Sequence, residues 1–154
     1  MIHFHTEDID FTLKNKNILK KWISSVVKKN KREIQDLNFV FCSDEFLLNI
    51  NKQFLNHDTY TDIITFDYSM DNKNQAISGD IYISIERVRE NAGKFSKTVE
   101  QELHRVIIHG TLHLLGYKDK TKAAKAEMTK QEEVCLKELG SFDKLRMTKK
   151  INKE

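Results

Sequence analysis

The 154-residue chain contains no proline and has only five glycines and two cysteines. Because it lacks proline and any run rich in glycine and serine, nothing in it marks a domain boundary. Its length fits one domain that can bury a core of its own. Cys42 and Cys135 are far apart and form no Cys-x-x-Cys motif. We therefore expect two buried, reduced thiols, as in a cytoplasmic protein, and no disulfide framework.

Long apolar segments are also missing. No stretch approaches the roughly 18 uncharged apolar residues of a transmembrane helix. The N-terminal segment Met1–His5 has neither the basic nor the apolar region of a secretory signal. With a mean hydropathy of −0.57, the sequence excludes a membrane protein, and its 39% hydrophobic content argues against a disordered chain. These features predict a cytoplasmic location and no membrane partner.

Charge is unevenly distributed around a formal net charge of +3. Eight basic residues and no acidic residue lie between Lys14 and Arg32, and five basic residues and one acidic residue lie between Lys144 and Glu154. The stretch from Glu33 to Asp71 has Lys52 as its only basic residue. Two basic ends on a neutral-to-acidic body are typical of a surface that faces a polyanion. Lysine-rich helices that are simply solvated would show the same pattern.

The apolar periodicity predicts four strands and five helices. The strands are expected at Ile2–His5, Leu37–Cys42, Asp62–Phe66 and Ile77–Ser84. The helices are expected at Asn17–Lys31, Ser43–Leu55, Ile85–Lys94, Thr98–Leu115 and Lys122–Leu139. This mixture predicts an α+β fold: a small mixed four-stranded sheet packed with about five helices, with the long fourth helix as its spine.

The connections carry further signals. The polar segment Ser69–Gln75 favours a hairpin between the last two strands. Thr98 and Gln101 form a capping-box pattern before the fourth helix. The last helix is expected to close at Gly140, and its apolar residues only partly fit one stripe: Met128, Val134, Leu136 and Leu139. We expect one domain over residues 1–146 and a basic, frayed tail over residues 147–154.

Two histidines and an aspartate have the spacing of a metal site. His109 and His113 are four residues apart, about 40° from alignment on a helix, so both imidazoles can reach one ion. Gly116 can end the helix and reverse the chain, which brings Asp119 to the place of a third ligand. The spacing matches the metzincin zinc frame with Asp in place of its last His. We predict one Zn²⁺ per chain with an open fourth position, which is typical of catalytic zinc.

Two neighbouring positions refine this prediction. His104, five residues before His109, lies about 140° around the helix and is not expected to bind the same ion. Zinc peptidases place a general-base Glu directly after the first His, but this chain has Gly110 there. A zinc peptidase is therefore disfavoured. The chemistry would then depend on the metal, the bound substrate or a base from elsewhere.

At these residues the sequence resembles the YbeY family of bacterial endoribonucleases, also described as rRNA maturation factors. Segment His109–Tyr117 matches every fixed place of H-G-x-L-H-L-x-G-Y, the start of the family's hallmark. The stretch from Leu48 through Phe66 is similar to the family's L-N…D-x-x-T-D-V-L-S-F, and Gly79–Ser84 is similar to its G-D-I-x-I-S strand.

The resemblance implies a zinc-dependent, single-strand-specific endoribonuclease of one α+β domain. It implies action in small-subunit rRNA 3′-end maturation and in ribosome quality control. The expected partners are ribosomal RNA, the small ribosomal subunit, and ribosomal proteins or an assembly GTPase. Two alternatives remain open: a non-catalytic ribosome-assembly factor with a structural zinc, and the disfavoured zinc peptidase.

The resemblance also assigns roles to residues. By carry-over, His109 and His113 are zinc ligands, and Asp119 stands where most family members have a third His. Leu55 occupies the place of a family arginine, which puts the RNA contact at that spot in doubt; His57 either replaces it or is an ordinary loop histidine. RNA phosphates are expected to contact the helix lysines Lys20, Lys21, Lys28 and Lys29.

Overall fold

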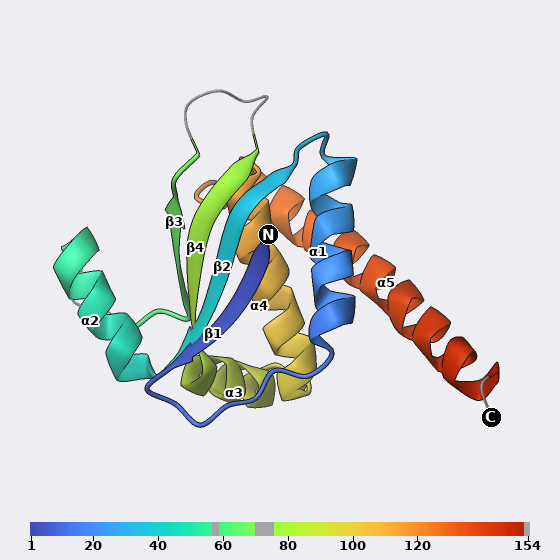
Figure 1. The fold of residues 1–154 in the computed structure, drawn as a ribbon. Coiled ribbons are helices and arrows are strands. Elements are labelled where there is room, and N and C mark those ends of the chain that lie inside the picture. Colours follow the sequence, from blue (N-terminus) through green and yellow to red (C-terminus); the bar gives the residue numbers. More distant parts are fainter. Residues whose placement is uncertain (57–58, 70–75, 153–154) are drawn as a thin grey trace.

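A four-stranded sheet forms the centre of the structure, a computed structural model that describes residues 1–56, 59–69 and 76–152 (Figure 1). The strands are β1 (Ile2–Glu7), β2 (Ile34–Cys42), β3 (Ile63–Asp67) and β4 (Ile77–Ser84), in the order β1-β2-β4-β3. Strands β1, β2 and β4 are parallel, whereas β3 is antiparallel to β4. The predicted α+β class with a mixed four-stranded sheet is confirmed. Residues 70–75 of the expected hairpin turn lie outside the described residues.

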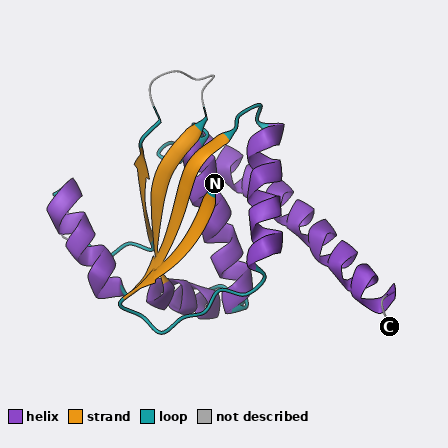
Figure 2. Ribbon diagram, in the orientation of Figure 1, coloured by secondary structure: helices purple, strands orange, loops and turns teal. Residues whose placement is uncertain are grey.

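Within the described residues, five helices accompany the sheet, as predicted (Figure 2). They are α1 (Lys16–Lys29), α2 (Asp44–Leu55), α3 (Ile85–Lys94), α4 (Val99–Leu114) and α5 (Lys122–Asn152). The side chains of Ser43, Ser84 and Thr98 cap α2, α3 and α4, and Thr98 forms the predicted capping box with Gln101. No helix in the described ranges is both long enough and apolar enough to cross a membrane.

The last helix differs from the prediction. α5 continues through Gly140 to Asn152, although we expected it to end at Gly140. A glycine inside a helix costs only about 1 kcal/mol relative to alanine, which the helical turns on either side can offset. The partial fit of its apolar residues to one stripe has a structural reason: Val134 is exposed, and the buried positions among the described side chains are Met128, Glu132, Cys135 and Leu139. Their 4-3-4 spacing is that of one helix face, with a glutamate at one position.

The two sheet faces pack against different helices. Alternate strand residues, including Phe39 and Ile81, join the main core with apolar residues of α1, α4 and α5. On the opposite face, Phe66 and Tyr82 belong to a smaller cluster with α2. Strand residues alternate between the faces with a period of two, so β2, β3 and β4 each contribute to both clusters, whereas the apolar residues of β1 join the main core.

Helix α4 lies directly against β3 and β4 at Gly110. A Cβ atom at this position would stand 2.9 Å from side-chain carbons of both Ile63 and Ile81. The glycine therefore allows a close approach between helix and sheet that any other residue would obstruct. This approach places the C-terminal half of α4, which carries His109 and His113, at the sheet.

Candidate metal centre

The turn after α4 has the geometry expected from the sequence. Gly116 has φ +104°, a conformation that residues with a Cβ rarely adopt. The Gly116 N–H donates to the carbonyl of His113 at 3.0 Å, and the Tyr117 N–H donates to the carbonyl of Leu112 at 3.1 Å. These two bonds make a Schellman motif, which ends the helix and reverses the chain. The reversal brings Asp119 back beside the histidines.

Three side chains converge at this turn. The Nε2 atoms of His109 and His113 are 3.1 Å apart, and Asp119 Oδ2 lies 3.4 Å from the first and 3.2 Å from the second. Tetrahedral zinc with ligand distances of about 2.0–2.1 Å separates its ligand atoms by about 3.3–3.4 Å. The triangle of ligand atoms therefore has the size that a zinc-like ion requires, and the three residues together could hold a metal ion.

The site is reached from solvent. The side chains of His109, His113 and Asp119 are 22%, 27% and 37% exposed. Three protein ligands with one accessible side leave room for water or substrate, which is the pattern of a catalytic rather than a structural metal site. The carboxylate and imidazole donors suit several divalent metals, so the donor set does not select zinc alone.

Two charged side chains, Glu132 and Arg105, follow His109 on the Nδ1 side of its ring. Its Nδ1 atom is 2.6 Å from Glu132 Oε2, and Glu132 Oε1 is 2.7 Å from Arg105 Nη1. Burial alone would lower the pKa of His109, but the hydrogen bond to Glu132 and the nearby charges of Glu132, Asp119 and Asp62 outweigh it and raise the pKa. These carboxylates favour a cation at this position, whether a proton or a metal ion.

Sequence reasoning missed Glu132 because it lies 23 residues beyond His109 on another helix. One signal was present: Glu132 interrupts the apolar spacing of Met128, Cys135 and Leu139. A charged residue within such a stripe is seldom buried without a partner.

Buried Glu102 was also overlooked. It precedes His109 by seven residues, which places it on about the same helix face. Burial raises the pKa of its carboxyl.

The other predicted residues lie elsewhere. Among the described residues, the candidate metal-binding group does not include His104, which contacts Glu100 at 3.9 Å and the ring of Trp22. His57 lies outside the described residues. The four lysines predicted to contact RNA are all exposed on α1: Lys20, Lys21, Lys28 and Lys29.

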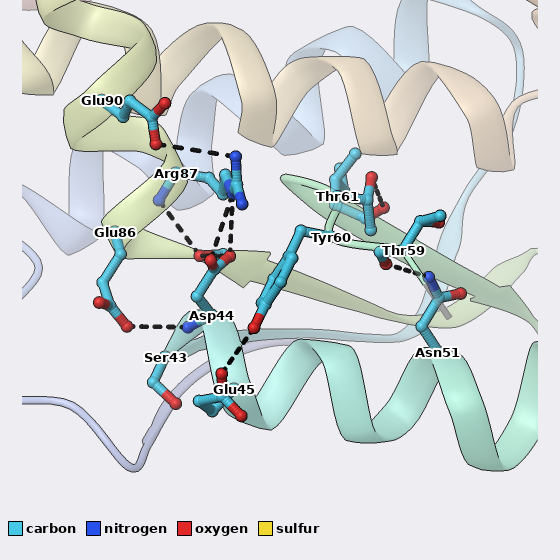
Figure 3. A network of polar contacts seen from close by, with 12 residues as sticks. Ser43, Asp44, Glu45, Asn51, Thr59, Tyr60, Thr61, Glu86, Arg87 and Glu90 are labelled. Carbon is cyan, nitrogen blue, oxygen red and sulfur yellow. Dashed lines mark hydrogen bonds and ion pairs between the residues drawn. The ribbon is translucent and has the colours of Figure 1, made fainter. Parts of the chain in front are cut away.

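Polar contacts hold the segment that leads into β3 (Figure 3). The Arg87 guanidinium pairs with Asp44 at 3.1 Å and lies over the Tyr60 ring, 5.0 Å from its centroid. The Tyr60 hydroxyl donates to Glu45 at 2.8 Å, and Asn51 donates to the Thr59 carbonyl at 2.7 Å. Helices α2 and α3 thus hold Thr59 and Tyr60, which lie just before the strand that approaches Gly110.

The family model described as Endoribonuclease YbeY matches residues 1–140. The chain belongs to this family. Two proteins named Endoribonuclease YbeY are 49% and 50% identical to it, from Cytophaga hutchinsonii and Flavobacterium psychrophilum. These matches cover 88% and 89% of this chain, and 93% and 95% of the two relatives.

A solved structure of the same fold is also known. The solution structure of TM1509 from Thermotoga maritima superposes with a TM-score of 0.62 at 32% identity, covering 92% of this chain and 93% of that protein. The family resemblance inferred from the motifs is confirmed, and so is the prediction of an enzyme of the endoribonuclease class.

Proposed function

We propose that the protein is a metal-dependent, single-strand-specific endoribonuclease that acts in the cytoplasm on the 3′ end of small-subunit ribosomal RNA and in ribosome quality control. The observation that carries this proposal is the triangle of ligand atoms from His109, His113 and Asp119, with sides of 3.1–3.4 Å. Membership in the YbeY family supports the reaction class. Expected macromolecular partners are the small ribosomal subunit and, through it, ribosomal proteins or an assembly GTPase.

The three ligand residues would hold one Zn²⁺. When bound, such an ion lowers the pKa of a water molecule and polarises a phosphate oxygen. The chain's own contribution is to keep the three ligand atoms on one side and leave the other side open to RNA. Residue 110 cannot carry the general base of a zinc peptidase, because the place of its side chain is taken by Ile63 and Ile81. This contact supports the nuclease over the peptidase.

The basic helix α1 would hold the RNA backbone. Lys20 and Lys28 line a groove of about 530 Å³ together with Arg32. Lys29 instead pairs with Glu138 of α5 at 3.1 Å, which partly neutralises its charge. The Tyr117 hydroxyl donates to Asn30 at 3.1 Å, so the C-terminal end of α1 lies beside the turn of the metal centre. Phosphates bound along α1 would therefore lead toward the metal.

The test is cleavage of a single-stranded RNA with the sequence of a small-subunit 3′ end, using a duplex of the same sequence as control. Purified protein should cleave the single strand, lose activity with a chelator, and regain it when zinc is added. His113→Ala should neither bind zinc nor cleave. Cleavage that survives both chelation and His113→Ala would contradict the proposal. Zinc binding and thermal stabilisation without cleavage would instead identify a non-catalytic assembly factor.

A further inference from the structure

A buried carboxylate of α5 lies directly behind the metal centre. Glu132 is 6% exposed and shares the inward stripe of α5 with Met128, Cys135 and Leu139. Burying an ionised carboxylate costs several kcal/mol unless charged or hydrogen-bonding partners compensate for it. Its partners therefore indicate why the glutamate occupies a core position.

Both partners of Glu132 come from α4. One carboxylate oxygen, Oε2, lies 2.6 Å from His109 Nδ1, and the other, Oε1, lies 2.7 Å from Arg105 Nη1. Arg105 and His109 are four residues apart, so they face α5 one helical turn from each other. The opposite ring nitrogen of His109, Nε2, faces His113 and Asp119. The imidazole thus bridges the buried carboxylate and the ligand triangle.

We propose that Glu132 is a positioning residue for the metal ligand His109: its carboxylate accepts the Nδ1–H bond, and this leaves the Nε2 lone pair aimed at the ion. Arg105 holds the carboxylate in place from the other side. Carboxylate–histidine–metal arrangements of this kind fix both the tautomer and the ring orientation of the ligand. The inference rests on the proposed metal centre and adds the residue of α5 on which that centre depends.

The chain contains a matched control for this role. Glu133 also pairs with Arg105, but from the exposed side of α5. If Glu132 only joined α4 to α5 through Arg105, the two glutamates would have similar effects on the metal. If Glu132 acts through His109, only its replacement should change metal affinity.

The experiment measures the zinc Kd by competition with a chromophoric chelator, in the full chain and in four variants. These are Glu132→Ala, Glu132→Gln, Glu133→Ala and Glu133→Gln. We expect Glu132→Ala to weaken zinc binding about 10–100-fold, the usual effect of removing such a partner. Glu132→Gln should bind more tightly than Glu132→Ala, because the amide oxygen still accepts from Nδ1–H. Both Glu133 variants should stay within about twofold of the parent.

A second readout does not depend on bound metal. Long-range ¹H–¹⁵N NMR of the metal-free protein should show His109 as the Nδ1–H tautomer, at a pH where the ring is neutral. The tautomer is read in the parent protein, so this readout carries the test even if Glu132→Ala fails to fold. A predominant Nε2–H tautomer in the parent would overturn the inference.

The same measurements separate this inference from the proposed function. Parent-like zinc affinity in folded Glu132→Ala, with binding abolished in His113→Ala, would overturn the role of Glu132 alone. Equal losses of affinity in the Glu132 and Glu133 variants would assign the effect to helix docking and also overturn that role. A parent protein that binds no zinc would overturn both the inference and the metal centre.

Discussion

The end of α4 that carries the candidate metal ligands and the basic surface of α1 pack on the same core but are organised differently. In the first region, three ligand atoms from His109, His113 and Asp119 lie within 3.4 Å of one another. In the second, the lysines have separate surroundings: Lys20 lies 6.0 Å from the Phe4 ring centroid, whereas Lys29 pairs with Glu138.

This difference determines what each region can tolerate. Metal coordination depends on distances that must be met within a few tenths of an ångström, so the loss of one ligand removes most of the affinity. Attraction to a polyanion depends on the number of charges near the surface, and each lysine contributes a modest, salt-dependent part of the binding free energy. Single substitutions should therefore have large effects at the end of α4 and graded effects on α1.

The largest effect is expected at Asp119. Asp119→Ala leaves two protein ligands and should weaken zinc binding by more than the roughly 10–100-fold that loss of a supporting partner costs. Asp119→His should keep zinc, because imidazole supplies a ligand at the same turn. Zinc content and Kd measure both effects, and Lys118→Ala is the neighbouring control. If Asp119→Ala binds zinc as tightly as the parent, the third ligand lies elsewhere, and His57 and His104 should be tested next.

The close approach of α4 to the sheet should appear as a stability effect. Gly110→Ala places a Cβ 2.9 Å from carbons of Ile63 and Ile81, an overpacking that costs about 1–3 kcal/mol in unfolding free energy. Gly93→Ala, in α3, meets no atom within 4 Å. It should be neutral or gain up to about 1 kcal/mol from helix propensity. Urea unfolding measures both, and equal stability of the two variants would contradict the role assigned to Gly110.

A smaller, graded effect is expected on α1. Changing Lys20, Lys21, Lys28 and Lys29 together to Gln should leave folding and zinc content unchanged, because all four are exposed. RNA affinity should fall, and the slope of log K against log salt should become shallower by about one for each phosphate that the variant no longer neutralises. Lys28→Gln alone should have more effect than Lys29→Gln, whose charge Glu138 partly neutralises.

Filter binding at several salt concentrations measures this prediction for α1. Unchanged affinity and slope in the quadruple variant would mean that the helix is a solvated face. The RNA surface would then have to lie in the C-terminal tail or around the metal centre.

The smallest effect concerns the two buried cysteine thiols. Burial raises the pKa of Cys42 to about 12 and that of Cys135 to about 11, so neither thiol is ionised at about pH 8. The Cys135 carbonyl accepts the Trp22 indole N–H at 2.7 Å, which ties α5 to α1. We expect no labelling by a disulfide reagent in the native state and two labelled thiols in denaturant. Rapid native labelling of Cys135 would show that the inner side of α1 is loosely packed.

Local patterns in the sequence determined much of this protein. The spacing of His109 and His113 and the glycine at position 116 predicted the ligand cluster, because helix geometry and backbone sterics act over a few residues. Periodicity located four strands and five helices for the same reason. It also predicted an end at Gly140, where α5 continues, because a single glycine weakens a helix by too little to end it.

Only the tertiary structure decided which distant groups meet. The order β1-β2-β4-β3, the close approach of Gly110 to Ile63 and Ile81, and the hydrogen bond between His109 and Glu132 join residues from different elements. Val134 and Glu132 show the consequence most clearly, because the apolar residue is exposed and the charged one is buried. Side-chain polarity alone would predict the reverse. The outcome depends on how α5 docks on α4, where Arg105 and His109 compensate the buried charge of Glu132.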